Sequence, residues 1–518
     1  MDRATIAKFV RSLSTWGIDL SERGPSSYCG VHVEAAHWTF ILMPPASVIS
    51  PSISSGSPGE SIQSLASRLG SLSRSLSSPP QEQTEIKEPE IEAGGVIPPV
   101  PETLEDTGLA ASVVHQLILK MLYSQGELLG GDLAEKLGLK FSLIEKIIDF
   151  LKHQRLIEAK RSLGMGNSTV LFALTETGRN STRECLESNQ YTGPAPVPLH
   201  QYTQIIRRQR RADGWLTPEA LQHAYRRMVM TPRILAQIGP AVSSGNSFLI
   251  YGQPGNGKTF LAEALMNVDD TCVYIPYALD CQGTIVQVYD PLYHQPVQDT
   301  EEQSVFSSGP QHDRRWIKCR RPFIVTGGEL TLGMLDLNYN ATSKVYDAPY
   351  QLKANNGIYL IDDFGRQQCT PAEILNRWIV PMERRVDYLK FHSGGKITVP
   401  FEAFLIFSTN QNPEQLGDEA FLRRIQYKML LRSPDEHEFQ TIFQKFCESR
   451  SLPHQDGLIA HFIEKHYRKT KRAFRRCHPR DVISHAIDLI HFEKLPFELT
   501  GDLLDRAFES CFLEETGD

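Results

Sequence analysis

The first periodic pattern of apolar residues lies in the segment 109–185. Apolar positions recur three and four residues apart over two long stretches, which predicts amphipathic helices. A shorter stretch between them begins at an Asp cap and ends at a glycine, as helices do. Two β-rich runs then flank a Gly-Met-Gly-Asn turn. The pattern predicts three helices followed by a hairpin, at 109–124, 130–138, 142–154, 156–160 and 169–174.

A second pattern, further along the chain, consists of short apolar runs that end in polar residues. These runs occupy 247–251, 357–361 and 404–407. Runs of four or five apolar, β-prone residues are typical of strands buried on both faces of a parallel sheet. From residue 433 to 516 the periodicity is largely helical. The sequence therefore predicts an α/β fold with a parallel sheet and a C-terminal helical domain.

Composition and charge narrow the class of protein. Hydrophobic residues make up 41% and charged residues 22% of the 518 residues, as in ordinary globular chains, and the net charge of −7 argues against a polyanion binder of the histone kind. The nine cysteines form no Cys-x-x-Cys pair, and Cys281 and His294 lack metal-ligand spacing. No apolar run reaches the ~18 residues of a membrane span, and the N-terminus lacks a signal-peptide core. We expect a cytoplasmic protein with no membrane contact.

The first apolar run, 247–251, leads directly into the motif Gly-x-x-x-x-Gly-Lys-Thr. Glycines in such a loop let backbone N–H groups surround phosphate oxygens, and the N-terminus of the following helix adds positive charge. Lys258 is expected to neutralise the β- and γ-phosphates of ATP, and Thr259 to ligate Mg²⁺. The residues predicted to bind the nucleotide are Gly252, Gln253, Pro254, Gly255, Asn256, Gly257, Lys258, Thr259 and Phe260.

The second apolar run ends in two acids, Asp362 and Asp363. An acid at the end of the neighbouring strand is the second half of a P-loop site, so Asp362 is expected to hold the magnesium ion with Thr259. Asp363 stands where many ATP-hydrolysing P-loop proteins carry the Glu that polarises the attacking water. Because Asp is one methylene shorter, Asp363 is the weakest of the catalytic assignments.

These motifs together resemble the AAA+ ATPases over about residues 216–516. The resemblance implies that Asn410, after the third run, is sensor 1 and orients water near the γ-phosphate. It makes Arg423 and Arg424 candidates for the arginine finger, which acts on a neighbouring subunit, with Arg424 slightly preferred. Arg480, in His-Pro-Arg-Asp at a predicted helix start, resembles sensor 2. Salt-bridged surface arginines are the alternative for both finger candidates.

Two short strands around a Ser-Gly-Gly turn, 386–389 and 396–399, form a hairpin just before the sensor 1 strand. Such a hairpin is similar to that of the AAA+ group with MoxR proteins, magnesium chelatase subunits and bacterial enhancer-binding activators. By position, the segment 339–350 would supply a central-pore loop, with Tyr346 as its aromatic residue. An aromatic residue packed on the subunit surface is the alternative.

The three helices and hairpin of the first pattern resemble a MarR-like winged-helix domain. The third predicted helix carries Glu145, Lys146, Asp149 and Lys152, which mix both signs of charge. A DNA-reading helix should present basic and amide groups, so protein docking is favoured slightly over DNA reading, and a structural spacer stays open. The basic segments 207–211 and 465–476 are candidates for nucleic-acid contact, although a solvated surface is favoured for both.

The chain is thus divided at changes of composition and pattern, with Ser/Pro-rich stretches interpreted as disordered. The predicted parts are a small N-terminal element (1–43), a disordered linker (44–107), the winged helix (108–185), a second linker (186–215), the AAA+ nucleotide-binding domain (216–432) and the helical lid (433–518).

Three functions remain open at this point. The first is a ring-forming ATPase, expected to be a hexamer, that remodels or unfolds a macromolecular client selected by the winged helix. The second is a DNA-associated ATPase, such as a loader, transposition helper or transcription regulator, with DNA bound by residues 108–185. The third is a non-hydrolysing switch that assembles on ATP, for which Asp363 in place of Glu is the only support.

Overall fold

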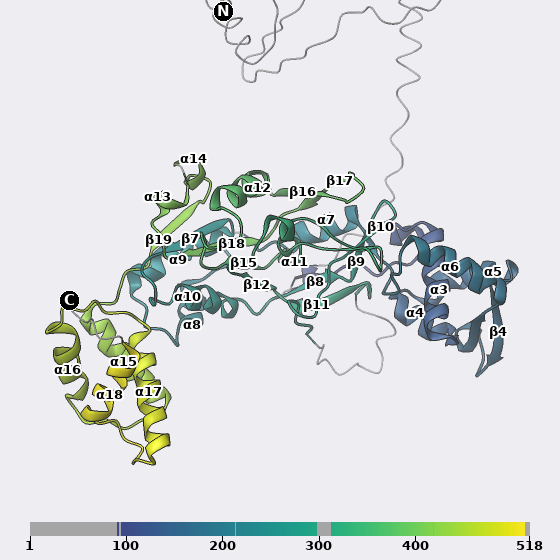
Figure 1. Cartoon of the computed structure of the whole chain (residues 1–518). Coiled ribbons are helices and arrows are strands. Elements are labelled where there is room, and N and C mark those ends of the chain that lie inside the picture. Colours follow the sequence, from purple (N-terminus) through teal and green to yellow (C-terminus); the bar gives the residue numbers. More distant parts are fainter. Residues whose placement is uncertain (1–90, 93–94, 213, 298–311, 418, 513–518) are drawn as a thin grey trace, which may run out of the picture. The chain divides into compact units, whose positions relative to one another are not determined.

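The computed structural model describes residues 91–92, 95–212, 214–297, 312–417 and 419–512 (Figure 1). All of them belong to one of the two compact units into which the chain divides, residues 84–518. The predictions for residues 1–43 and for 44–90 lie outside the described residues. None of the described helices is long and apolar enough to cross a lipid bilayer.

A five-stranded parallel sheet, built from residues between 247 and 430, forms the central layer of this part of the chain. The three apolar runs predicted as strands are all in it and pair side by side. Because alternate side chains point to opposite faces, Phe248 and Ile250 lie in one core cluster and Leu249 in another. The α/β fold class is therefore confirmed. In sheet order the strands are β12 (Phe323–Thr326), β15 (Ile358–Ile361), β18 (Phe404–Thr409), β7 (Ser247–Tyr251) and β19 (Tyr427–Leu430).

Helices cover both faces of this sheet. One face packs with the helices that flank β7, and its core includes Leu221, Ile238 and Leu261. The other face packs on α12, whose Trp378 is fully buried. The covering and connecting helices are α8 (Pro218–Ala224), α9 (Pro232–Ser244), α10 (Lys258–Ala264), η3 (Leu265–Asn267), η4 (Leu332–Leu335), α11 (Tyr350–Lys353), α12 (Pro371–Arg384), α13 (Pro413–Leu416) and α14 (Glu419–Leu422).

The C-terminal domain is a helical bundle with its own aromatic core, as predicted from the periodicity. Phe439, Phe443, Phe462, Tyr467 and Phe508 are buried together in it. Its helices are α15 (Glu436–Ser449), α16 (Leu458–Ile463) continued by the π-helical turn η5 (Glu464–Arg468), α17 (His478–Glu493) and α18 (Gly501–Cys511).

The elements predicted between 109 and 174 are present in the expected order, followed by one more helix. Their apolar stripes form a single core, and the two main strands are antiparallel with β5 between β3 and β4. The elements are η1 (Glu105–Thr107), α3 (Ala111–Gln125), β3 (Leu128–Leu129), α4 (Gly130–Leu137), α5 (Phe141–His153), β4 (Ile157–Ser162), η2 (Asn167–Thr169), β5 (Val170–Leu174) and α6 (Glu176–Ser188).

The segment 186–215 is not a linker, which corrects the prediction. It contains the end of α6, strand β6 (Val197–Pro198) and helix α7 (Leu199–Arg208). Tyr202 and Ile206 of α7 are buried in the core of the insertion that follows β7 and α10. The proline-rich sequence obscured this, because a ten-residue helix shows too few apolar repeats to stand out. The end of the first predicted linker is also packed, since Val96 is buried in the same core.

The insertion between α10 and β15 carries a second, mixed sheet that sequence reasoning missed. Its order is β13-β14-β10-β9-β6, with β8 and β11 paired beside it. The strands are only three to five residues long, too short for a reliable period. They are β8 (Cys272–Pro276), β9 (Ala278–Cys281), β10 (Thr284–Gln287), β11 (Trp316–Arg320), β13 (Asn338–Asn340) and β14 (Val345–Asp347); the hairpin β1 (Ile91–Glu92) and β2 (Gly95–Val96) precedes them in the chain.

The hairpin predicted before sensor 1 is present as β16 (Val386–Lys390) and β17 (Lys396–Pro400). It packs on the insertion sheet through Tyr346, whose ring centroid lies 5.0 Å from that of Phe391. The Tyr346 hydroxyl also accepts a hydrogen bond of 3.0 Å from the His392 backbone. Tyr346 is 6% exposed on β14, so its assignment to a pore loop is wrong; it is buried in the core of the insertion and not packed on the subunit surface.

Candidate nucleotide-binding site

The Gly-x-x-x-x-Gly-Lys-Thr loop joins the end of β7 to the start of α10, as the motif requires. Gly252 has φ 145°, Gly255 has φ 78° and Gly257 has φ 83°, conformations that favour glycine. Neighbouring atoms also exclude a side chain, because a Cβ on Gly252 would lie 2.4 Å from the Leu431 carbonyl oxygen. The turn therefore favours glycine at all three positions, and the close approach of the chain after β19 additionally requires it at Gly252.

Lys258 lies inside this loop and is 7% exposed. Its Nζ donates to the carbonyl oxygens of Gly252 at 3.0 Å and Gln253 at 3.2 Å, and to the Asn410 Oδ1 at 2.5 Å. Burial lowers the pKa of Lys258, while the nearby charges of Asp362 and Asp363 raise it. The ammonium group is thus held at the carboxyl edge of the sheet by neutral oxygens that a phosphate oxygen can replace.

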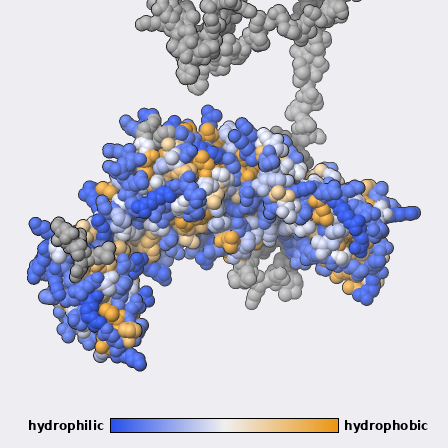
Figure 2. Space-filling view, in the orientation of Figure 1, coloured by the Kyte–Doolittle hydropathy of each residue, from blue (hydrophilic) through white to orange (hydrophobic). Residues whose placement is uncertain are grey.

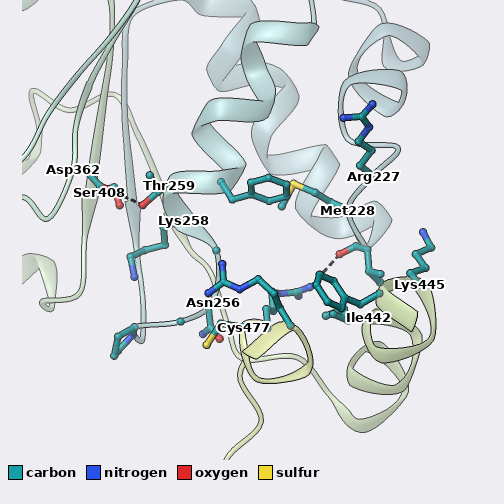
Figure 3. Close-up of a pocket in the computed structure, with 18 of the residues that line it drawn as sticks. Arg227, Met228, Asn256, Lys258, Thr259, Asp362, Ser408, Ile442, Lys445 and Cys477 are labelled. Carbon is teal, nitrogen blue, oxygen red and sulfur yellow. Dashed lines mark hydrogen bonds between the residues drawn. The ribbon is translucent and has the colours of Figure 1, made fainter. Parts of the chain in front are cut away.

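The two acids and sensor 1 meet at the same edge. Thr259 Oγ1 donates to Asp362 Oδ2 at 2.7 Å, the contact drawn as a dashed line in Figure 3. Asn410 Nδ2 donates to Asp363 Oδ1 at 3.0 Å. Asp363 has φ 47°, a left-handed conformation that is uncommon for a residue with a side chain. Asn410 therefore links the lysine of the loop to the second acid.

A cavity of about 610 Å³ opens over these groups, within the size range of small-ligand sites. In Figure 3, Lys258, Thr259 and Asp362 lie at one end of it, and Met228, Ile442 and other residues lie at the opposite end. The first end combines an ammonium with a carboxylate and a hydroxyl, while the second combines apolar side chains with the charged Arg227 and Lys445. Phe260, 53% exposed at the start of α10, also lines the cavity.

These residues fit a nucleoside triphosphate and a magnesium ion. The loop offers backbone N–H groups and an ammonium for phosphates, and the hydroxyl of Thr259 with the carboxylate of Asp362 is a hard oxygen pair for Mg²⁺. Among the described residues no group of three or more His, Cys, Asp and Glu side chains forms a metal cluster of its own. A magnesium ion would therefore depend on phosphate oxygens and water for its remaining ligands.

The C-terminal domain closes the site from the opposite side, through contacts that the sequence did not predict. The Cys477 backbone donates to the Gly255 carbonyl oxygen at 2.9 Å. Arg475 donates to Ser433 Oγ at 2.5 Å, and Asn256 Nδ2 lies 3.3 Å from the same oxygen. The loop and the lid are therefore joined by hydrogen bonds, which supports the lid interpretation of residues 433–518.

Two lid arginines line the cavity rather than one. Arg480, the sensor 2 candidate, is paired with the adjacent Asp481 at 2.8 Å and its side chain is 64% exposed. Arg476 is only 11% exposed and is held by Glu438 at 3.0 Å and by the Val229 carbonyl oxygen at 3.1 Å. Sequence reasoning missed Arg476, and its only sequence signal was the basic run 465–476.

The two finger candidates do not line this cavity, so the structure places them outside the site of their own chain. Arg424 Nε is paired with Glu383 Oε1 at 3.0 Å and its side chain is 29% exposed. Arg423 is exposed and forms no ion pair with another residue in the described part of the chain. Of the two arginines, Arg423 is therefore the more exposed and Arg424 the paired one.

The described core is thus a parallel α/β sheet with a glycine-rich loop and two acids at its carboxyl edge. Residues 435–510 match a family model described as a domain of unknown function, DUF8689. No curated protein matches the sequence. Among solved structures the chain is similar to NtrX from Brucella abortus, with 13% identity and a TM-score of 0.35 over 56% of each chain. It is also similar to a RuvB mutant of Thermotoga maritima, with 14% identity and a TM-score of 0.31 over 57% of this chain and 71% of RuvB. A third similar structure is domain III of the Thermotoga maritima replication initiation protein DnaA, with 14% identity and a TM-score of 0.31 over 58% of this chain and 99% of that domain. The chain spans little more than half of NtrX.

The lid provides a pH-dependent prediction through His478 at the start of α17. Burial and the charge of Arg475 lower the pKa of His478 to about 4 from an ordinary value of 6.5. The unfolded chain therefore binds a proton that the folded chain does not, and the stability contributed by neutral His478 is present above pH 6.5 and is lost as pH falls toward 4. At about pH 5 we expect a loss of stability from this group, which solvent screening of the partly exposed ring limits to about 1 kcal/mol. Denaturant unfolding of wild type and His478→Gln at neutral and acid pH measures it, and equal acid sensitivity of the two proteins would contradict it.

Proposed function

We propose that this chain hydrolyses ATP with magnesium, in the cytoplasm, and uses the energy to remodel a macromolecular client. The observation that carries the proposal is the linked group of Lys258, Asn410 and Asp363 beside the Thr259–Asp362 pair. Each residue type matches a requirement of phosphoryl transfer to water, which depends on positioning and on stabilising negative charge.

Each residue of the site has a separate role in ATP hydrolysis. The loop N–H groups and Lys258 bind the phosphates. Asp362 and Thr259 would hold a magnesium ion, which would neutralise part of the negative charge of the phosphates. Asp363, oriented by Asn410, accepts the hydrogen bond from the attacking water. Arg476 and Arg480 add positive charge from the lid side.

We infer a ring, a hexamer by resemblance, because the finger candidates lie outside their own chain's site. In that ring Arg423 of one subunit reaches the phosphates of the next, while Arg424 remains paired with Glu383. An arginine finger stabilises transition-state charge that the site of a single chain does not neutralise.

We assign the domain of α3–α6 to client docking as a winged helix. Two acidic side chains of α5 already have partners within the domain. Glu145 accepts a hydrogen bond from Asn167 Nδ2 at 2.9 Å, and Asp149 forms an ion pair with Lys152 at 3.0 Å. Phe150 on the same helix is 47% exposed and stacks with His115 at 5.1 Å between ring centroids. An exposed aromatic residue among balanced charges suits a protein partner better than a DNA groove.

The test is ATP turnover in wild type and Asp363→Asn. The amide keeps the hydrogen bond to Asn410 but cannot act as a base, so we expect ATP binding to be kept and turnover to fall by about 100-fold or more. Turnover is followed by phosphate release, and binding by calorimetry. If wild type binds ATP, assembles and never releases phosphate, the chain is the non-hydrolysing switch and the proposal fails.

A further inference from the structure

A cluster of arginines lies at the edge of the central sheet that is opposite the nucleotide site. The nucleotide groups follow the carboxyl ends of β7, β15 and β18, whereas this cluster lies where the same strands begin. Arg210, Arg211, Arg321 and Arg385 line one small concavity there, together with Glu402 and the start of β15 at Gly357. We name this set, with Arg207, the arginine cluster.

The charges in the cluster are unbalanced. Arg207, Arg210 and Arg385 all act on the single carboxylate of Glu402, and Arg211 and Arg321 share the single carboxylate of Asp269 at 2.8 and 3.2 Å. Within the described part of the chain, Arg207 and Arg210 are exposed and form no ion pair closer than these interactions. Five guanidinium groups therefore face two carboxylates, in a chain whose net charge is −7.

The carboxylate of Glu402 compensates the cluster poorly. Burial raises the pKa of Glu402 even though three arginines act to lower it. Arg385 is fixed beside it with φ 55°, and its guanidinium donates to the Gly245 carbonyl oxygen at 2.9 Å. The fold thus holds a half-buried arginine, which caps the C-terminus of α12, at a place where positive charge is already in excess.

We propose that the arginine cluster binds the phosphate backbone of a nucleic acid. The positive side chains are all arginines, whose planar guanidinium matches phosphate oxygens in a bidentate way, and Arg207 and Arg210 have free donors. Arg211 lies over the ring of Trp215, 4.0 Å from its centroid, so this tryptophan holds one guanidinium of the cluster in place. A structural role is the competing explanation, because a positive charge in the last turn stabilises a helix. That role accounts for Arg207 at the C-terminus of α7, but it does not account for the position of Arg210.

The cluster is joined to the nucleotide site by a single strand. Arg385 immediately precedes β16, and Glu402 lies between β17 and β18, so the cluster is the base of the hairpin. At its other end β18 leads to Asn410, which contacts Lys258 and Asp363. Binding of nucleic acid at the cluster does not rest on the proposed function, whereas any effect of that binding on ATP turnover does.

The experiment measures the affinity of the full chain for a labelled single-stranded oligonucleotide and for the corresponding duplex, by anisotropy over a range of salt. We expect Arg207→Glu/Arg210→Glu to weaken binding by about tenfold or more and to make the salt dependence less steep, since two phosphate contacts are removed. The milder Arg207→Gln/Arg210→Gln gives a smaller loss in the same direction and serves if the first variant folds poorly. ATP binding stays unchanged in both, because the nucleotide site is at the opposite edge of the sheet.

Two matched variants decide between the cluster and other surfaces. Arg179→Glu/Arg183→Glu on α6 makes the same change of charge away from the cluster and is expected to bind as wild type does. Lys146→Glu/Lys152→Glu on α5 tests the winged-helix surface, and loss of binding in this variant alone overturns the proposal. Binding of polyglutamate but of neither oligonucleotide also overturns it, in favour of an acidic protein. If oligonucleotides bind at the cluster and no ATP is hydrolysed, the proposed function fails while this inference stands.

Apolar surface, unlike charge, does not mark an interaction site on the face of the chain drawn in Figure 2. Hydrophilic and hydrophobic residues alternate over the face drawn, without one continuous apolar band. The largest exposed apolar residues are spread over several elements, among them Phe150, Met165, Phe260 and Phe492. Charge rather than apolar area therefore distinguishes the arginine cluster as an interaction surface.

Discussion

Replacing Lys258 with alanine is expected to weaken ATP binding and to reduce ATP turnover even more strongly. The ammonium supplies the one buried positive charge inside the loop, and a charged hydrogen bond to phosphate contributes about 1.5–3 kcal/mol, so its loss corresponds to roughly 10–100-fold weaker binding. The change also leaves Asn410 Oδ1 without its donor, which removes the link between the loop and Asp363. Turnover should therefore fall by more than binding does, and calorimetry beside phosphate release measures the two effects separately.

Lys465→Ala is the control for this prediction. Lys465 is an exposed lid residue paired with Asp505 at 2.6 Å, so its removal takes away one positive charge far from the loop. We expect wild-type binding and turnover in this variant. ATP binding of wild-type strength in Lys258→Ala would show that the nucleotide is held elsewhere and would contradict the assignment of the site.

The parts of the site that were predictable are those in which a short stretch of sequence already contains the geometry. The loop from Gly252 to Thr259 needs glycines, a lysine and a hydroxyl at fixed spacing, and nothing distant decides its shape. The same holds for Asp362 and Asn410, because the end of an apolar run marks the edge of a parallel sheet. Parallel neighbours bring those ends together whatever the connections between them.

The parts that were missed depend on contacts between distant segments. Arg476 reaches the cavity because Glu438 and the Val229 carbonyl oxygen hold it there, and neither partner is near it in the sequence. Helix α7 likewise looked like a linker because its burial is decided by the insertion. The buried Asn355 donates to the Tyr202 hydroxyl at 2.8 Å and fixes that helix against the central domain. Polar residues in tertiary contacts carry no period, so a sequence pattern gives no signal for them.

The arginine cluster falls between these two cases. The run 207–211 was visible as a basic segment, and a solvated surface was the favoured interpretation. What the sequence could not supply was Arg385 and Arg321, which join the run from other elements to form one concavity. An excess of charge at one place is a property of the fold, and it changes the interpretation of residues that are unremarkable along the chain.

Arg423→Ala is expected to leave ATP binding and assembly intact and to reduce turnover by roughly 10³-fold or more, the effect of removing an arginine finger. The physical reason is that Arg423 is exposed and unpaired among the described residues, so its charge is available to a neighbouring subunit. Arg424→Ala should have a smaller effect, because its guanidinium is already paired with Glu383 and that pair is partly exposed. Turnover and oligomer mass in the presence of ATP are measured for both variants.

Mixing experiments make the test independent of folding. Arg423→Ala supplies intact loops, and Lys258→Ala supplies intact fingers, so mixed rings contain some complete sites at the boundary between one subunit of each kind. Two inactive proteins should therefore regain part of the wild-type turnover when combined, whereas two proteins damaged in one site of the same chain cannot. Recovery by Arg424→Ala mixtures but not by Arg423→Ala mixtures would reverse the assignment, and its absence in both would mean that each site is complete within its own chain. That last result would also remove the reason for a ring, because the cavity of one subunit would then contain every group needed for turnover.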